Sequence, residues 1–251
     1  MAKVYFVGAG PGDPDLITVK GRRIVEQADI IIYAGSLVNK EIINCRRSDA
    51  EVHNSASMTL EEVIDVMKTG AAAGKIIARV HTGDPSIYGA IREQIDELIK
   101  LSIEYEVVPG VSSFTAAASV LGMEFTLPGV SQTVICTRLE GRTPVPESED
   151  LELLASHRAS MAIFLSVHMM DTVVKKLKVH YDGDTPVAIV QRATWPDQKI
   201  VMGTLDDISN KIEAEDIDKT AMILVGDFLG NVYDRSLLYD GSFTHGFRKG
   251  I

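Results

Sequence analysis

Short apolar runs alternate with longer amphipathic segments along the first half of the chain. A continuous apolar run is typical of a strand covered on both faces, and apolar residues spaced by three and four are typical of a helix. The pattern predicts strands at residues 3–7, 29–33, 51–54, 75–79 and 105–108, and helices at 15–27, 60–73 and 90–99, with an alanine-rich helix that ends at 121. Thr59 and Glu62 have the spacing of a capping box, and Gly74 is placed to end that helix. Strands that alternate with helices predict a parallel sheet.

The second half of the chain predicts a mixed sheet. Two apolar runs, 187–191 and 199–203, are expected to form an antiparallel hairpin with a long connection. Further strands are predicted at 132–137, 162–165 and 221–225, and helices at 169–178 and 205–213. Residues 125–129 resemble a linker. We therefore expect an N-terminal α/β domain at 1–124, a C-terminal α/β domain at 130–230 and a tail at 231–251, with Phe228, Tyr233 and Tyr239 as candidates for docking the chain end.

Loops rich in glycine and proline follow several of the predicted strands. They lie at residues 8–14, 83–85 and 109–113. A single loop of this kind is most often an ordinary turn between a strand and a helix, but several at strand ends indicate the ligand-binding edge of an open α/β sheet. The first loop does not fit a dinucleotide, because Asp13 stands where the GxGxxG pattern needs its last glycine.

Composition and charge argue against several classes of protein. A formal net charge of −10 disfavours a broad nucleic-acid surface, and no apolar run is long enough to cross a membrane. Cys45 and Cys136 form no CxxC pair, and the histidines show no zinc-ligand spacing, so we expect a reducing compartment and no metal. The first strand begins close to Met1, and we expect a cytoplasmic protein without a signal peptide.

Five stretches together resemble the tetrapyrrole methylase family, which uses S-adenosylmethionine. The stretches are residues 7–14, 83–85, 108–113, 187–194 and 221–226. Residues 33–38 and 137–144 further resemble the branch of this family that methylates ring carbon 11 of precorrin-4 or cobalt-precorrin-4 in cobalamin synthesis. The resemblance implies two α/β domains with a ligand cleft between them, a homodimer, and a tetrapyrrole substrate that carries several carboxylates.

The resemblance also implies a set of cofactor-binding residues. S-adenosylmethionine, and its product S-adenosylhomocysteine, would contact residues of the glycine loops and backbone groups of the second half. These residues are Pro11, Gly83, Asp84, Ile87, Ser112, Ser113, Leu165, Ala193 and Ala221. Without the resemblance, Leu165, Ala193 and Ala221 would be interpreted as residues of the hydrophobic core.

Candidate catalytic and substrate-binding residues are charged. Asp84 would accept a hydrogen bond from the cofactor or offset its positive charge, unless it caps the following helix. Arg138 and Arg142, in a proline-rich loop, suit substrate carboxylates, since the guanidinium group matches a carboxylate in shape and charge. Arg192, at a strand end, is a candidate for the same role, and Arg46, Arg47 and Arg79 are weaker candidates, with solvated surface charge the better interpretation of Arg46 and Arg47. Glu140 and His81, placed on loops, are the candidate bases.

Other functions stay open on the sequence alone. A methyltransferase of the same fold could act on ribosomal RNA ribose or on the protein precursor of diphthamide, although the acidic charge speaks against RNA. A module that binds an adenosyl ligand without catalysis would carry the same glycine loops. The residues leave open whether the substrate contains cobalt, and the carbon that is methylated rests on the resemblance.

Overall fold

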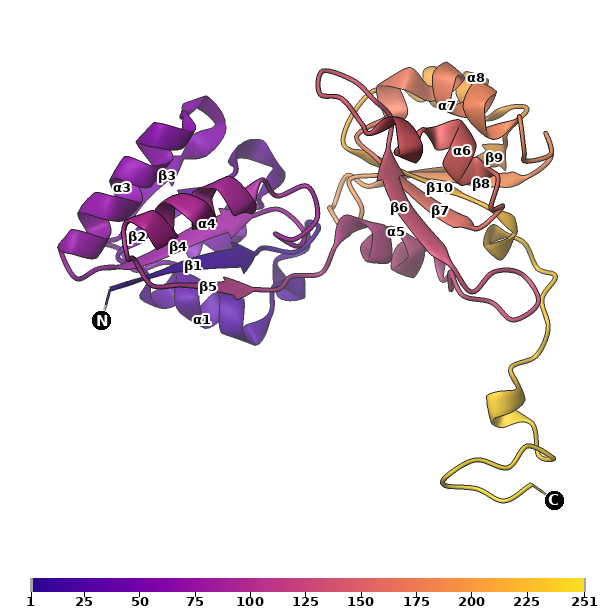
Figure 1. The fold of residues 1–251 in the computed structure, drawn as a ribbon, viewed down its shortest axis with the longest axis horizontal. Helices are drawn as coiled ribbons and strands as arrows, with labels where there is room; N and C mark the ends of the chain where they lie inside the picture. The colour runs from indigo at the N-terminus through magenta and orange to yellow at the C-terminus, as the bar shows by residue number, and fades with distance from the viewer. Residues whose placement is uncertain (1, 251) are drawn as a thin grey trace. The chain divides into compact units, whose positions relative to one another are not determined.

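The chain folds into two compact units. The computed structural model describes residues 2–250, apart from the side chain of Ser36. The first unit runs up to Ala116 and also includes Ala193–Asp197, and the second contains Ala117–Arg192 and the chain from Gln198 onward. Each unit is built on one five-stranded sheet (Figure 1). The domain limits expected at 124 and 130 stay a prediction.

The sheet of the first unit is entirely parallel, as predicted. Its strand order is β3-β2-β4-β1-β5. The strands are β1 (Lys3–Gly8), β2 (Ile30–Tyr33), β3 (Glu51–Asn54), β4 (Ile76–His81) and β5 (Tyr105–Val108). Because β1 lies between β4 and β5, the carboxyl ends of these three strands meet at one edge of the sheet.

Helices cover both faces of the first sheet. They are α1 (Val19–Gln27), α2 (Lys40–Asn44), α3 (Leu60–Ala72) and α4 (Ile91–Lys100). Helix α5 (Ser113–Leu121) begins in the first unit and continues into the second. Figure 1 shows α3 and α4 on the face opposite α1. Thr59 and Glu62 form the predicted capping box at the start of α3, and Gly74 follows its end with φ of +76°.

The helix predicted at 15–27 begins later than expected. The Thr18 hydroxyl accepts the N–H of Gly21, and α1 starts at Val19. The preceding residues form a separate single turn, Pro14–Leu16, in which the Asp13 side chain accepts the N–H of Asp15. The apolar spacing predicted one helix, but the caps at Asp13 and Thr18 divide this segment into a single turn and a shorter helix.

The sheet of the second unit is mixed, which confirms the predicted fold class. Its order is β6-β7-β10-β8-β9, with β6 and β7 parallel and the other neighbours antiparallel. The strands are β6 (Val134–Arg138), β7 (Ser160–Phe164), β8 (Pro186–Gln191), β9 (Lys199–Thr204) and β10 (Ala221–Val225). Helices α6 (Leu151–Ala155), α7 (Met170–Leu177) and α8 (Ile208–Ala214) pack against one apolar face. The sequence did not predict α2 or α6.

The end of the chain is anchored at one aromatic residue. Phe228 is fully buried and its ring centroid lies 4.8 Å from that of Phe125. Tyr233 and Tyr239 are 57% and 82% exposed, so only the first of the three expected docking residues is buried.

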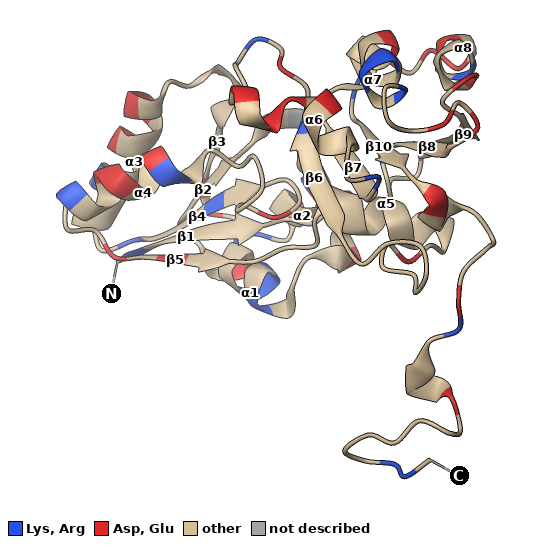
Figure 2. Ribbon diagram, turned by 45° about the vertical axis from the view of Figure 1, so that its right-hand side comes forward, with Lys and Arg blue, Asp and Glu red and all other residues tan. Residues whose placement is uncertain are grey.

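Many of the acidic side chains lie on helices. Figure 2 shows acidic residues gathered on α3, α4 and α6. Among the described residues, no helix combines the length and the apolar character that a membrane crossing would need.

Candidate functional site

Three glycine loops meet at the carboxyl edge of the first sheet. The loops follow β1, β4 and β5, which are neighbours in the sheet. Gly10 and Gly83 join two of them by a pair of backbone hydrogen bonds: the Gly83 N–H donates to the Gly10 carbonyl at 2.8 Å, and the Gly10 N–H donates to the Gly83 carbonyl at 3.2 Å. The predicted gathering of these loops at a single edge is confirmed.

The loops touch through their backbones. A Cβ atom on Gly110 would lie 2.2 Å from the Gly83 carbonyl oxygen, and one on Gly8 would lie 2.6 Å from the Gly110 Cα. Gly83 also has φ of +61°, which favours glycine. Because no side chain separates the loops, their backbones pack directly against one another.

Asp84 connects two of the loops. Its carboxylate accepts the backbone N–H of Ser86 at 2.8 Å, the Ser86 hydroxyl, and the N–H of Gly110 at 2.9 Å. Partial burial alone would raise the pKa of Asp84, but the hydrogen bonds from Ser86 and Gly110 outweigh it, and the pKa is lowered. The alternative that Asp84 caps the following helix is wrong, since the N-cap of α4 is Ala90.

Most of the predicted cofactor-binding residues of the first unit cluster around this edge. Ile87 closes the turn that begins at Asp84, donating its N–H to the Asp84 carbonyl at 3.3 Å. The backbone of Ser112 and Ser113 lies beside Gly83. The remaining two are Pro11, in the first loop, and Ala193, which is buried and precedes two residues that contact that loop.

Leu165 and Ala221 belong to the second unit. Leu165 directly follows β7, is 63% exposed and has φ of +54°, while Ala221 begins the neighbouring strand β10. Because β7 and β10 are antiparallel, the two residues lie at the same edge of the second sheet. Arg138, the last residue of β6, pairs with Phe164 and lies at this edge as well. The site residues therefore form two groups, one in each unit, and their roles stay a prediction.

Arg138 organises its own loop. Its guanidinium group donates to the carbonyls of Leu139 and Thr143, each at 3.2 Å, and to that of Pro144 at 2.7 Å. Glu140 and Arg142 are exposed on the same loop. The guanidinium group of Arg138 is thus engaged within the loop, whereas Arg142 is exposed to solvent.

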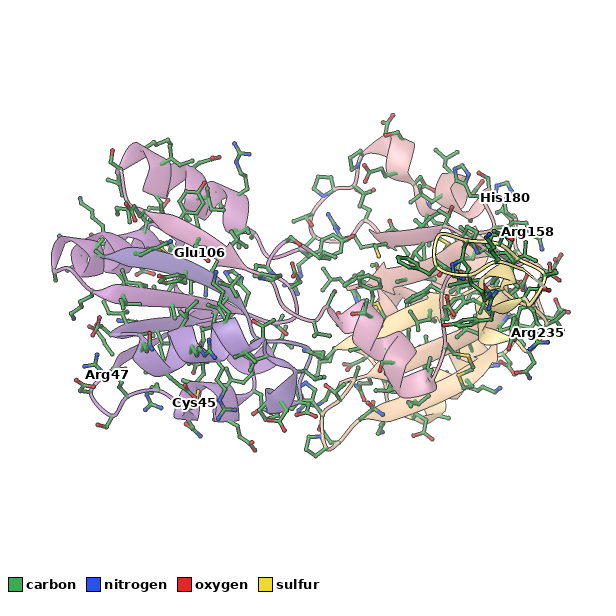
Figure 3. All side chains as sticks on the ribbon, turned by 90° about the horizontal axis from the view of Figure 1, so that it is seen from below. Cys45, Arg47, Glu106, Arg158, His180 and Arg235 are labelled. Atoms are coloured by element: carbon green, nitrogen blue, oxygen red, sulfur yellow. The ribbon has the colours of Figure 1, made fainter. Side chains whose placement is uncertain are left out.

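The weaker arginine candidates are engaged elsewhere. Arg47, labelled in Figure 3, forms ion pairs with Asp29 and Asp49 on the surface. Arg46 donates to the Ile43 carbonyl at 3.1 Å. Arg79 is only 7% exposed within β4, and its guanidinium group donates to the Gln94 side chain at 3.0 Å.

The sequence predicts His81 on a loop, but the structure shows it as the last residue of β4. The strand continues to this residue because Gly8 of β1 pairs with it. Its side chain is 3% exposed, and its Nε2 has no hydrogen-bond partner within residues 2–250. Burial, together with the nearby charge of Arg79, lowers the pKa of His81 to about 3. A neutral, enclosed imidazole of this kind is a poor candidate for a catalytic base.

We expect His81 to make the stability of the protein depend on pH. Its pKa falls from an ordinary 6.5 to about 3 on folding, so below pH 6.5 the unfolded chain takes up a proton that the folded chain does not. The free energy of unfolding should therefore drop by about 2 kcal/mol from this group between pH 7 and pH 5. Urea unfolding of the wild type and of His81→Gln at both pH values measures the difference.

His180→Gln is the matched control for that experiment. His180 is exposed and is labelled in Figure 3. This variant should keep the pH dependence of the wild type, whereas His81→Gln should lose about 2 kcal/mol of it. An unchanged pH dependence in His81→Gln would contradict the assignment.

Sequence reasoning missed three residues that hold the first glycine loop. Asn39, Thr194 and Trp195 each form a hydrogen bond to the backbone at residues 11–13. Trp195 is the single tryptophan of the chain and lies in the long connection between β8 and β9. That isolated aromatic residue in a polar loop was the available signal.

The edge formed by the three glycine loops contains backbone polar groups and the carboxylate of Asp84. Among residues 2–250, no three His, Cys, Asp or Glu side chains are grouped so that they could hold a metal ion. Backbone carbonyls and the Asp84 carboxylate suit a small polar ligand that carries positive charge.

Comparison with known proteins gives a consistent result. The family model described as Tetrapyrrole (Corrin/Porphyrin) Methylases matches residues 3–209. The cobalt-precorrin-4 C(11)-methyltransferase of Methanocaldococcus jannaschii is 57% identical over 249 residues, which are 98% of this chain and 96% of the relative.

Solved structures agree with this match. The X-ray structure of a cobalamin biosynthetic enzyme, cobalt precorrin-4 methyltransferase, has a TM-score of 0.90 and 48% identity, covering 91% of this chain and 96% of that one. Uroporphyrin-III C-methyl transferase from Thermus thermophilus, in complex with S-adenosyl homocysteine, has a TM-score of 0.75 and 26% identity, covering 90% of this chain and 93% of that one.

Proposed function

The chain belongs to the tetrapyrrole (corrin/porphyrin) methylase family, and on that premise we propose that it transfers a methyl group from S-adenosylmethionine to ring carbon 11 of precorrin-4 or cobalt-precorrin-4 in cobalamin biosynthesis. The observation that carries the proposal is the 57% identity, over nearly the whole of both chains, to an enzyme with that name. In this proposal the protein works in the cytoplasm as a homodimer.

The glycine loops of the first unit are the proposed site for the methyl donor. S-adenosylmethionine supplies an electrophilic methyl group on a positively charged sulfur. The contribution of the protein is then position and electric field, and correct alignment alone is worth about 7–11 kcal/mol of the barrier. The proposal is supported by the close packing of the loops, in which Gly8 and Gly110 leave no room for a side chain, and by the negative charge of Asp84 beside them.

The charged residues of the loop after β6 are proposed to meet the acceptor, whereas Leu165 and Ala221 stay proposed contacts of the donor. Arg142 and Arg138 would pair with carboxylates of the tetrapyrrole, with Arg138 also keeping the loop in shape through its carbonyl contacts. In the transfer, the bond between methyl carbon and sulfur breaks as the bond to the ring carbon forms. Glu140 is the proposed acceptor for any proton that the ring releases.

The test begins with the donor and ends with the product. Calorimetric titration with S-adenosylhomocysteine should show binding. Anaerobic incubation with S-adenosylmethionine and cobalt-precorrin-4, and in parallel with metal-free precorrin-4, should give a product one methyl group heavier, whose NMR spectrum identifies the carbon. Binding without a product from either acceptor would overturn the proposed substrate, and absence of binding would overturn the proposed donor.

Arg142→Gln and Arg92→Gln form a matched pair for the acceptor site. Arg142 is exposed on the loop beside Arg138, whereas Arg92 is 86% exposed on α4 and pairs with Asp96. Loss of one charge-assisted hydrogen bond, of about 1.5–3 kcal/mol, predicts that Arg142→Gln raises KM for the tetrapyrrole by about tenfold or more. Arg92→Gln should leave KM unchanged, and equal effects of the two changes would argue against a role for Arg142.

A further inference from the structure

The turn at residues 11–13 is held from outside by three side chains. The indole N–H of Trp195 donates to the Pro11 carbonyl at 2.8 Å. The Asn39 side-chain amide donates to the Gly12 carbonyl at 2.8 Å, and the Asp13 N–H donates to the Thr194 hydroxyl at 3.0 Å. Every residue of the turn is therefore fixed by a side chain from a distant part of the sequence.

Trp195 also explains why residue 12 is glycine. A Cβ atom on Gly12 would lie 2.1 Å from Cδ1 and 2.3 Å from Nε1 of the indole ring. The backbone of Gly12 does not have a positive φ, unlike that of Gly10 or Gly83. Conformation thus does not require glycine at this position, but the space taken by the indole does.

The segment that carries Trp195 has a strained backbone. Thr194 has φ of +70° and Arg192 has φ of +50°. The left-handed region is unfavourable for a β-branched residue such as threonine and persists only where the surroundings impose it. Here β8 and β9 fix both ends, with Gln191 paired to Lys199 and the Arg192 N–H donating to the Thr220 carbonyl at 3.0 Å. Strain of this kind is typical of segments that place a functional group.

We propose that Trp195 is a positioning residue for the methyl donor, and that it acts by holding residues 11–13 in the conformation that binds the donor. This inference rests on the proposed function, since it assumes that the donor binds at the glycine loops. The loop is already paired with the next one through Gly10 and Gly83. A loop that is already fixed before the ligand binds loses less conformational entropy on binding, and its affinity for the ligand is therefore higher.

A double-mutant cycle tests the inference. Gly12→Ala and Trp195→Ala should each weaken binding of S-adenosylhomocysteine by about tenfold, because either change separates the indole from the turn. Gly12→Ala added to Trp195→Ala should change affinity by less than about twofold, since the space is then free. If Gly12→Ala has the same effect in both backgrounds, the inference is wrong.

Trp195→Phe is a more conservative variant that tests the same role if Trp195→Ala does not fold. It keeps an aromatic ring over Gly12 but removes the N–H that Pro11 accepts. We expect KM for S-adenosylmethionine to rise by about threefold to tenfold with kcat nearly unchanged, because the residue positions the loop without touching the reacting atoms. A fall in kcat with KM unchanged would contradict a positioning role.

Hydrogen exchange separates this inference from the proposed function, because it needs no ligand. Backbone amides of Gly10, Gly12 and Asp13 should exchange at least about tenfold faster in Trp195→Phe than in the wild type, while those of β2 stay the same. Equal exchange at the loop would overturn the role of Trp195. A wild-type protein that shows slow exchange at the loop but binds no S-adenosylhomocysteine would overturn the proposed donor and leave the structural part of the inference intact.

Discussion

Gly110→Ala is expected to destabilise the protein by more than about 4 kcal/mol, the range reached only by severe changes in a core. The new Cβ would lie 2.2 Å from the Gly83 carbonyl oxygen and 2.8 Å from the Gly8 Cα. Both neighbours are backbone atoms at the ends of central strands, so neither moves without disturbing the pairing of β1 with β4 and β5. Urea unfolding measures the change.

Gly241→Ala is the control for this prediction. Apart from Gly241 and its two chain neighbours, no heavy atom lies within 4 Å of a Cβ at this position, and its φ is not in the positive range. The free energy of unfolding should change by less than about 0.5 kcal/mol in this variant. A Gly110→Ala protein within about 1 kcal/mol of the wild type would show that the three loops separate more readily than their contacts indicate.

Asp84→Ala is expected to weaken binding of S-adenosylhomocysteine by about a hundredfold. The carboxylate holds the turn through Ser86 and ties it to the next loop through the Gly110 N–H. Hydrogen bonds to a charged group contribute about 1.5–3 kcal/mol, and a hundredfold loss corresponds to about 2.7 kcal/mol. Calorimetry measures the affinity, with circular dichroism to check the fold.

Asp84→Asn separates geometry from charge. The single amide oxygen can still accept from Gly110, but the amide NH2 then faces the Ser86 N–H, so a requirement for the Gly110 hydrogen bond alone predicts a smaller loss of affinity than in Asp84→Ala. A requirement for negative charge near the sulfonium group predicts a loss with S-adenosylmethionine that is larger than with the uncharged product. Wild-type affinity in Asp84→Ala would remove Asp84 from the candidate site.

Much of the fold is encoded locally in this sequence. The strands at 51–54, 105–108 and 221–225 have the predicted limits, because each is a short run bounded by residues that favour turns. The capping box at Thr59 was readable for the same reason. The parallel and mixed sheets follow from the order of these elements, and the family match and the solved structures confirm the fold class.

Other features depend on contacts that the sequence does not display. Helices α2 and α6 have five residues each, too few for an apolar period, and only their caps Asn39 and Asp150 mark them. The sequence predicts His81 on a loop, but pairing with Gly8 extends β4 to this residue. Local apolarity therefore located the strand but not its end.

The candidate site shows the same division. That the glycine loops gather at one edge follows from parallel topology and could be predicted. The partner of Asp84 is 26 positions away at Gly110, and the indole of Trp195 reaches a carbonyl 184 positions earlier. No spacing rule connects residues so far apart, so the contacts that shape the first loop emerged only from the three-dimensional structure.

The first unit is completed by a segment from the other half of the chain, Ala193–Asp197, and this has a consequence for how the family can be recombined. A crossover near residue 117 would join a front half to a back half that brings its own residue at position 195. Gly12 in the front half is matched to tryptophan there. The two halves are therefore not interchangeable modules: positions 12 and 195 must be inherited or engineered together.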